Sequence, residues 1–316
     1  MSTVKWDNVY RTIFQQEWWL DCVTDGNYCA VSVKSDNLTQ GWLPYVMRRR
    51  WGYPISEMPF LTHTLGPVIA PGAGNETTEF LRHNAITREL MEQLPKLAHF
   101  RQVLAPNDMG ALGFIECGCH MRVQFTLISD CSDSSSLWKR MRDKTRNLIR
   151  RSEEKNTVRQ ETDSGEFLRL YADNCRERNE VNRYADPRTR RVLQLSTERD
   201  QGRIYLARDR GTGISTAGIA VVWDSRYMYF LMSTRSARAD NGAVSLLLWH
   251  AMQEAQSRGL SFDFDGVATS GAYRFLSGFG GTLARRHVAE RFNPVYHTLD
   301  KIRAKFYGNM TNPYSS

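Results

Sequence analysis

Hydrophobic residues recur along this chain with two different periods. Apolar and polar positions alternate in segments between residues 204 and 233, a pattern typical of antiparallel strands joined by short turns. The strands are expected at Ile204–Arg208, Ser215–Trp223 and Tyr227–Ser233. A helical stripe of apolar residues follows and predicts a helix over Asn241–Arg258.

The first part of the chain predicts a similar mixture of elements. A hairpin is expected where two alternating segments flank Ser35–Asn37, and a long loop where four prolines fall within Trp51–Gly74. In order, the expected elements are strands at Cys29–Val33 and Trp42–Met47, a helix at Glu76–His99, a strand at Val103–Leu104, a short helix at Asn107–Phe114 and a strand at His120–Ile128.

A polar segment, Asp130–Ser136, marks a candidate boundary. Further helices are expected at Leu137–Lys155, Phe167–Arg178, Pro187–Arg199 and His297–Tyr307. The succession of helix, strand, short helix and strand occurs before this boundary and again near the end of the chain. We therefore expect two related α/β halves, residues 1–130 and 131–316, each a mixed, mainly antiparallel sheet flanked by helices.

The most distinctive stretch lies between residues 259 and 292. A short buried strand, Leu260–Phe264, ends at Asp265-Gly266, and Thr269 or Ser270 can cap a short helix. Glycines then stop that helix, and an alternating strand follows from Leu283 to Phe292. The stopping glycines are Gly278, Gly280 and Gly281.

This stretch resembles the C-terminal signature of the FemABX-like branch of the GNAT acyltransferase superfamily. The matching residues are Phe262–Gly266, Arg274-Phe275 and Gly278–Gly281, supported upstream by Phe14–Leu20, Ala217–Val222, Tyr227, Tyr229 and Ala243–Trp249. The resemblance implies two tandem GNAT-like subdomains and transfer of an acyl or aminoacyl group to an amine. It implies aminoacyl-tRNA or acyl-CoA as co-substrate and no permanently bound cofactor.

Asp265 and Arg274 are the candidate catalytic residues. A carboxylate at the end of a buried strand could take the proton of an attacking amine, and Asp263 lies two residues earlier on the same face. A guanidinium could bind a phosphate or an oxyanion. The structural alternatives are that Asp265 caps the next helix and that Arg274 forms an ion pair with Asp263 or Asp265.

The resemblance also suggests substrate contacts, each of which could instead be a plain core or surface residue. These are Arg178, Arg183, Tyr184, Tyr229, Ser233 and Phe275. Many family members that use aminoacyl-tRNA have a lysine directly after the phenylalanine, where this chain has Leu276.

Donor phosphates have two candidate sites. The stretch Arg238–Ala243 partly matches the pyrophosphate loop of CoA-dependent GNAT enzymes, with Arg238 and Gly242 in place but Asn241 where a glycine is usual. The basic helix that contains Lys139, Arg142 and Arg146 could follow a phosphate backbone, although a solvated surface explains the same pattern.

Composition narrows the class of protein further. The chain has 316 residues and a formal net charge of +8, which favours anionic partners such as tRNA or a nucleotide. No stretch approaches the about 20 apolar residues of a membrane-spanning helix, and Met1–Arg11 has no apolar signal segment. With scattered cysteines and no second ligand pair for Cys117 and Cys119, we expect a cytoplasmic protein without a metal site.

Three functions therefore remain open. The first is an aminoacyl-tRNA-dependent transferase that acts on a cell-wall precursor, a peptide or a small amine. The second is an acyl-CoA N-acyltransferase that acts on a small metabolite or an amino sugar. The third is a non-catalytic, basic RNA-binding module. The sequence does not determine the oligomeric state.

Overall fold

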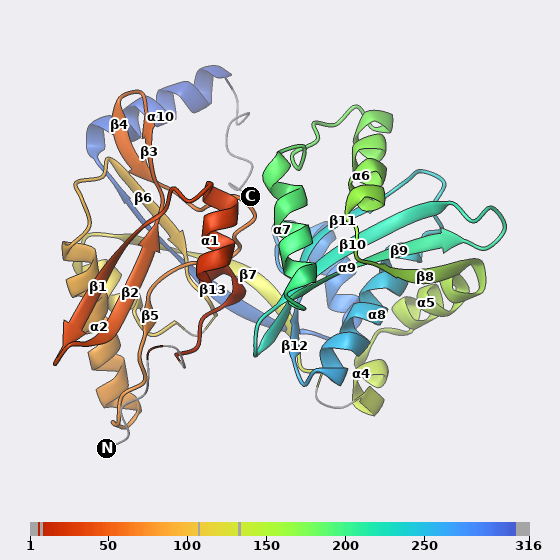
Figure 1. Ribbon diagram of the computed structural model, residues 1–316, viewed down its shortest axis with the longest axis horizontal. Coiled ribbons are helices and arrows are strands. Elements are labelled where there is room, and N and C mark those ends of the chain that lie inside the picture. The colour runs from red at the N-terminus through yellow and green to blue at the C-terminus, as the bar shows by residue number, and fades with distance from the viewer. Residues whose placement is uncertain (1–5, 7–8, 107, 132–133, 308–316) are drawn as a thin grey trace. The chain divides into compact units, whose positions relative to one another are not determined.

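The computed structural model describes residues 6, 9–106, 108–131 and 134–307, which form two compact units (Figure 1). Unit 1 comprises residues 1–124 and 285–316, and unit 2 comprises residues 125–284. This division differs from the split expected at residue 130, because the last strand carries the chain back into unit 1. The predicted helix start at Asn107 lies outside the described residues.

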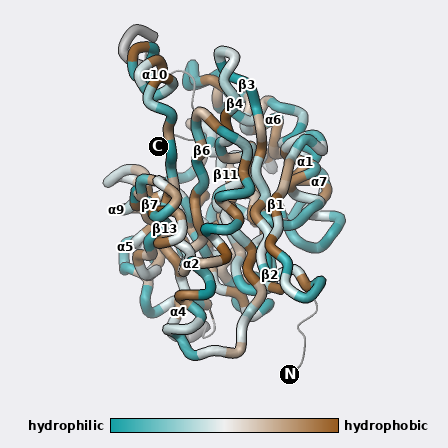
Figure 2. The backbone as a smooth tube through the Cα atoms, turned by 90° about the vertical axis from the view of Figure 1, so that its left-hand side faces the viewer, coloured by the Kyte–Doolittle hydropathy of each residue, from teal (hydrophilic) through white to brown (hydrophobic). Residues whose placement is uncertain are grey.

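Unit 1 contains two groups of paired strands, in the orders β1-β2-β5 and β3-β4-β6-β13. Its elements are η2 (Ile13–Gln15), α1 (Glu17–Thr24), β1 (Cys29–Ser35), β2 (Leu38–Tyr45), β3 (Met47–Arg50), β4 (Tyr53–Ser56), β5 (Val68–Ile69), α2 (Glu76–Glu92), β6 (His99–Val103), α3 (Ala111–Glu116), the first part of β7 (His120–Ser129), most of β13 (Thr282–Phe292), and α10 (Pro294–Tyr307). Strand β2 becomes buried toward its C-terminal end, whereas β1 is partly exposed along its length; both strands are labelled in Figure 2. Leu43 of β2 belongs to the same buried cluster as Ile86 and Leu90 of α2.

The hairpin predicted around Ser35–Asn37 is confirmed. Strands β1 and β2 pair antiparallel, and Asp36 and Asn37 at its turn have positive φ angles of 49° and 61°. Both residue types tolerate this left-handed conformation, which matches the twist of a two-residue hairpin turn.

The long loop predicted for residues 51–74 is wrong in part, because this stretch contains β4 and β5. Strand β4 pairs with β3 and β6 even though it contains Pro54. Pro54 has no N–H to donate, but its carbonyl accepts a hydrogen bond from the Ala98 N–H at 2.8 Å.

Unit 2 has the strand order β7-β12-β11-β10-β9-β8. Its elements are the end of β7, α4 (Ser134–Arg140), α5 (Asp143–Lys155), β8 (Asn156–Glu161), α6 (Gly165–Glu177), α7 (Pro187–Glu198), β9 (Gly202–Asp209), β10 (Ser215–Trp223), β11 (Tyr227–Arg235), α8 (Ala243–Ser257), β12 (Ser261–Asp263), α9 (Ser270–Leu276), η3 (Ser277–Phe279) and the start of β13. Helices α6 and α7 cover one face of the sheet, and α5 and α8 cover the other (Figure 1). The predicted α/β fold with mixed, mainly antiparallel sheets is confirmed.

The helix predicted over Leu137–Lys155 is broken in two. Arg142 is extended, with ψ of 144°, and its N–H donates to the Gly278 carbonyl at 2.9 Å. The glycine motif permits this close approach: a Cβ on Gly278 would lie 2.4 Å from the Thr145 Oγ1. Gly280 has φ of 81°, and its Cβ would lie 2.8 Å from the Arg140 carbonyl oxygen.

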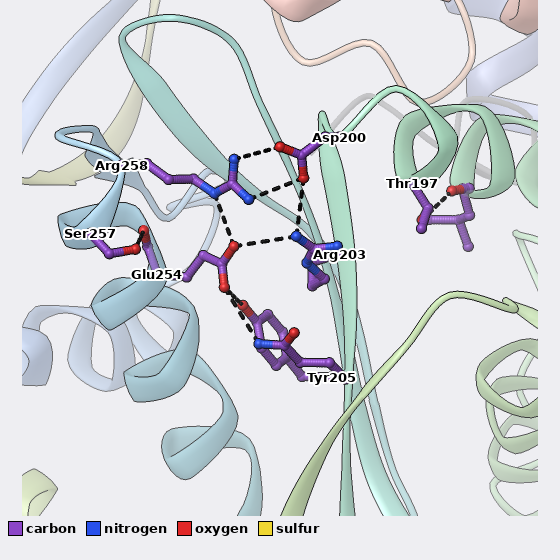
Figure 3. A network of polar contacts seen from close by, with 9 residues as sticks. Thr197, Asp200, Arg203, Tyr205, Glu254, Ser257 and Arg258 are labelled. Carbon is purple, nitrogen blue, oxygen red and sulfur yellow. Dashed lines mark hydrogen bonds and ion pairs between the residues drawn. The ribbon is translucent and has the colours of Figure 1, made fainter.

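A network of ion pairs fixes the end of α8 against β9 (Figure 3). Arg258 donates to Asp200 and to Glu254, each at 2.9 Å. Glu254 also accepts from the Tyr205 hydroxyl at 3.2 Å, and the Arg258 guanidinium lies 4.3 Å from the ring centre of Trp223. Because several charges share one geometry, this network holds α8 more firmly than an isolated surface pair would.

Asp263, which ends β12, is a buried carboxylate that joins three segments of unit 2. Its Oδ1 accepts hydrogen bonds from the Thr126 hydroxyl and from the Asp265 N–H, the latter at 2.9 Å. Strand β12 pairs with β11 only from Ser261 to Asp263. The carboxylate therefore holds the chain in place where regular pairing stops.

Unit 1 contains a buried histidine between two glutamates. His99 Nε2 lies 3.1 Å from Glu290 Oε1, and His99 Nδ1 lies 3.4 Å from Glu57 Oε1. Burial disfavours the charged ring, but the hydrogen bonds and charges of both carboxylates outweigh this and raise the pKa of His99. Although burial opposes it, His99 and the arginines Arg48, Arg50, Arg101 and Arg122 lower the pKa values of the two carboxyls that they face.

Replacing Asp263 tests its role in the fold. Asp263→Ala leaves two donors without their acceptor, and we expect it to lower the free energy of unfolding by about 2–4 kcal/mol. Asp263→Asn keeps one acceptor oxygen, so this variant should lose less free energy of unfolding. Urea unfolding of both variants measures the difference, and an Ala variant with the midpoint of the parent would contradict this role.

The His99 cluster predicts how stability depends on pH. Because the folded pKa of His99 is raised, its contribution is fully present below the unfolded value of 6.5 and is lost as pH rises through the folded pKa. The contributions of Glu57 and Glu290 are present above 4.5 and are lost as pH falls through their lowered folded pKa values. His99→Gln should cost about 3 kcal/mol near pH 6 and abolish the alkaline decline. Urea unfolding across this range would refute the prediction if parent and variant gave parallel curves.

Candidate functional site

The strands β11 and β12 separate after three paired residues, and the candidate site surrounds this point in unit 2. Asp265 follows β12 with φ of 50°, in the left-handed region. Thr269 rather than Asp265 caps α9, because the Thr269 Oγ1 accepts from the Ala272 N–H at 3.1 Å. The structural alternative considered for Asp265, a helix cap, is therefore wrong.

The charge of Asp265 acts on Tyr184, a predicted substrate contact in the loop between α6 and α7. Burial raises the pKa of Tyr184, and the charge of Asp265 raises it further, while Arg183 opposes both effects. The ring of Tyr184 packs edge-on against Tyr171 of α6, with ring centres 5.2 Å apart. The structure thus relates Asp265, a predicted catalytic residue, to Arg183 and Tyr184, two predicted substrate contacts. Tyr171, which the sequence did not single out, packs against Tyr184.

Arg274 projects from the last turn of α9 beside a cavity of about 450 Å³. The cavity is lined by Phe125, Val267, Ala268, Thr269, Ser270, Tyr273, Arg274 and Leu283. Arg274 is the only charged residue among them. It forms no ion pair with any described residue, so the ion pair with Asp263 or Asp265 that the sequence left open is absent from the described part of the chain.

Phe275 follows Arg274 and is exposed, whereas Leu276 is buried. Phe275 packs edge-on against Phe279, with ring centres 5.7 Å apart. The position where related enzymes have a lysine therefore points into the core here, which explains why an apolar residue occupies it.

Arg178 was predicted to contact the substrate and Asn241 the donor phosphates. Both form hydrogen bonds with Arg235, at the end of β11. The Arg178 guanidinium donates to the Arg235 carbonyl, and the Arg235 guanidinium donates to the Asn241 Oδ1 at 3.5 Å. These contacts link the end of α6 to the loop before α8. Arg238 in the same loop is exposed.

A carboxylate lies just before the start of α8, although no side chain caps the first turn of this helix. Asp240 Oδ2 accepts from the Gly242 N–H at 3.0 Å, and Asp240 Oδ1 lies 3.6 Å from the Lys155 ammonium. A pyrophosphate bound here would face the charge of this carboxylate, which Lys155 offsets in part. Sequence reasoning missed Asp240, although an aspartate two residues before a glycine is a known signal for such a turn.

Two predicted substrate contacts lie in the framework of unit 2. Tyr229 is buried, and its hydroxyl donates to Asp224 Oδ2 at 2.9 Å. Ser233 is half-buried and pairs across the sheet with Ile219. Tyr229 thereby fixes the turn at Asp224 that leads into β11.

The basic helices α4 and α5 present exposed cations on unit 2. Lys139, Arg142, Lys144 and Arg151 are exposed and have no carboxylate partner among the described residues. Arg146 differs, because it forms an ion pair with Asp143 and donates to the carbonyls of Trp138 and Lys139. Of the three phosphate contacts predicted in this basic segment, Lys139 and Arg142 are therefore available to an anion. Arg146 is engaged by Asp143 in its own turn and by two carbonyls of α4.

Within the described part of the chain, no group of three or more metal-ligating side chains lies together. No helix among the same residues is long and apolar enough to cross a membrane.

Residues 137–275 match the family described as Acetyltransferase (GNAT) domain. No curated protein matches the chain. Among solved structures, FemX has a TM-score of 0.70 at 12% identity, covering 91% of this chain and 94% of its own. The C-terminal domain of a putative lysylphosphatidylglycerol synthetase from Agrobacterium fabrum has a TM-score of 0.57 at 14% identity, covering 90% of both chains.

A tandem GNAT protein from the clavulanic acid biosynthesis pathway also has this fold, with a TM-score of 0.50 at 12% identity over 84% of this chain and 83% of its own. These likenesses confirm the tandem fold that the motifs around Asp265 and Gly278 predicted. Residues 137–275 are thus similar to a GNAT acetyltransferase domain, and the chain as a whole has the fold seen in FemX.

Proposed function

We propose that this protein transfers an aminoacyl group from aminoacyl-tRNA to the amine of a peptide, a cell-wall precursor or a small metabolite. The observation that carries this choice of donor is the carboxylate of Asp240 at the start of α8. In a CoA-dependent enzyme this helix start would receive the pyrophosphate. Here the Gly242 N–H is already satisfied by a negative charge, which disfavours a dianionic ligand.

The surface charges of unit 2 support the same donor. Lys139, Arg142 and Lys144 are exposed without carboxylate partners and can contact successive phosphates of an RNA strand. The acceptor arm of a tRNA gains affinity from such contacts.

The chemistry requires little beyond orientation and proton removal. An amine attacks the ester carbonyl that joins the amino acid to the tRNA ribose, and the ribose oxygen leaves with a proton. We assign Asp265 as the group that accepts the amine proton, because it follows a buried strand and its charge acts on the phenol of Tyr184. We assign Arg274 as the contact for the carbonyl oxygen as it gains charge, because its guanidinium is unpaired beside the cavity.

An acyl-CoA donor is the alternative, and the match of residues 137–275 to an acetyltransferase domain favours it. Arg238 is exposed in the loop that would then hold the pyrophosphate. In that case the Asp240 carboxylate would have to turn away when CoA binds.

Variants of Asp265 and Arg274 test the catalytic assignment. Asp265→Asn keeps a residue that tolerates the left-handed backbone but removes the base, so we expect transfer to slow by about 10²–10⁴-fold. Arg274→Ala should slow transfer by about 10²–10³-fold. The measurement is transfer of a radiolabelled amino acid from charged tRNA to a set of amino sugars, peptides and muropeptide precursors.

Two matched substitutions serve as controls for this assay. Asp25→Asn changes another left-handed aspartate, and Arg169→Ala removes another exposed arginine, on α6. Both should transfer at the parent rate. Full activity in Asp265→Asn and Arg274→Ala would remove both residues from the mechanism.

Donor binding separates the candidate functions. We expect charged tRNA to bind more tightly than uncharged tRNA, and binding should weaken as salt rises. Lys144→Ala should reduce the slope of log affinity against log salt by about one, because one phosphate contact is lost. Micromolar binding of acetyl-CoA without a preference for charged tRNA would establish the CoA alternative. Equal binding of charged and uncharged tRNA, with no transfer, would indicate an RNA-binding module.

A further inference from the structure

Helix α10 of unit 1 has an apolar face that no described residue covers. Val295, Leu299 and Ile302 are 58%, 40% and 50% exposed, and their spacing places them along one side of the helix. Tyr296, on a neighbouring side, is fully buried and anchors α10 to the β3–β4 hairpin. The anchor fixes the direction in which the exposed stripe faces.

The tip of the β3–β4 hairpin adds an aromatic residue beside this helix. Trp51 has φ of 53°, a left-handed conformation that is costly for a bulky side chain, and it is 42% exposed. The Arg50 and Arg303 guanidiniums lie 4.6 and 5.4 Å from its ring centre. Trp51 also packs against Tyr296 of α10, with ring centres 5.6 Å apart.

The charges around this surface are mainly positive. Arg49, Lys301 and Arg303 have no carboxylate partner among the described residues. The two nearby carboxylates are already neutralised, because Asp300 lies 3.3 Å from Arg50 and Glu57 lies 2.8 Å from Arg48. Hydrophobic and hydrophilic residues alternate along α10 (Figure 2).

We propose that α10 and the tip of the β3–β4 hairpin dock on the surface of an anionic lipid bilayer. A helix with an apolar stripe and a basic rim lies in the plane of such a surface, with the stripe among the upper acyl chains. Tryptophan side chains prefer the interface between headgroups and acyl chains. Cations without ion-pair partners are attracted to the negatively charged headgroups. A nucleic acid would satisfy the cations but would leave Val295, Leu299 and Ile302 against water, so the bilayer fits better.

Co-sedimentation of the full chain with vesicles tests this proposal. Vesicles of phosphatidylcholine alone are compared with vesicles that also contain phosphatidylglycerol. We expect binding only to the anionic vesicles, and weaker binding as salt rises. The double substitution Leu299→Glu with Ile302→Glu should lower the apparent affinity at least about tenfold, because it places two charges on the apolar face.

A control and a second variant make the result decisive. Leu81→Glu changes an exposed leucine on α2 of the same unit, and it should bind vesicles as the parent does. Arg49→Ala with Lys301→Ala leaves the apolar stripe intact and should reduce the preference for phosphatidylglycerol. The proposal is overturned if the parent binds both vesicle types equally or if the double glutamate variant binds as the parent does. It is also overturned if that variant loses tRNA binding while vesicle binding is unchanged.

Discussion

The buried carboxylate of Asp263 is the interaction on which the arrangement of the site depends. Strand β12 is only a few residues long, so its backbone pairing alone cannot define where β11 and β12 part. The Asp263 carboxylate fixes that point by accepting from Thr126 of β7 and from the Asp265 N–H. Asp265 is then held in a left-handed conformation, and the chain turns toward α9 and the cavity beside Arg274.

In unit 2, the charged residues of the framework are paired with one another, whereas those on surfaces that can bind a ligand are not. Asp200, Glu254 and Arg258 neutralise one another at the end of α8, and Arg146 and Asp143 do so at the start of α5. Arg274 and the exposed cations near Lys144 have no such partner. A cation without an ion-pair partner interacts more strongly with an incoming anion than one that is already neutralised. These positions are therefore where a negatively charged substrate would bind most favourably.

The sequence predicted features that local chemistry determines. The turn at Asp36-Asn37, the cap at Thr269 and the helix α8 depend on residues close together in the chain, and all three have local signals. The break at Arg142 could not be predicted, because the Gly278 carbonyl that causes it comes from a distant segment. The return of β13 to unit 1 is equally non-local, since its alternation identifies a strand but not its partner.

The same contrast applies to the candidate site. Motif resemblance identified Asp265 and Arg274, but the role of Asp240 depends on which group satisfies the start of α8, and this becomes visible only in three dimensions. A basic RNA-binding module would need the exposed cations of α4 and α5 and nothing more. It would not need a left-handed aspartate held by a buried carboxylate, nor an unpaired arginine beside an apolar cavity. These two features have a ready explanation if the unit performs acyl transfer, because that reaction requires a positioned base and a group that binds developing negative charge.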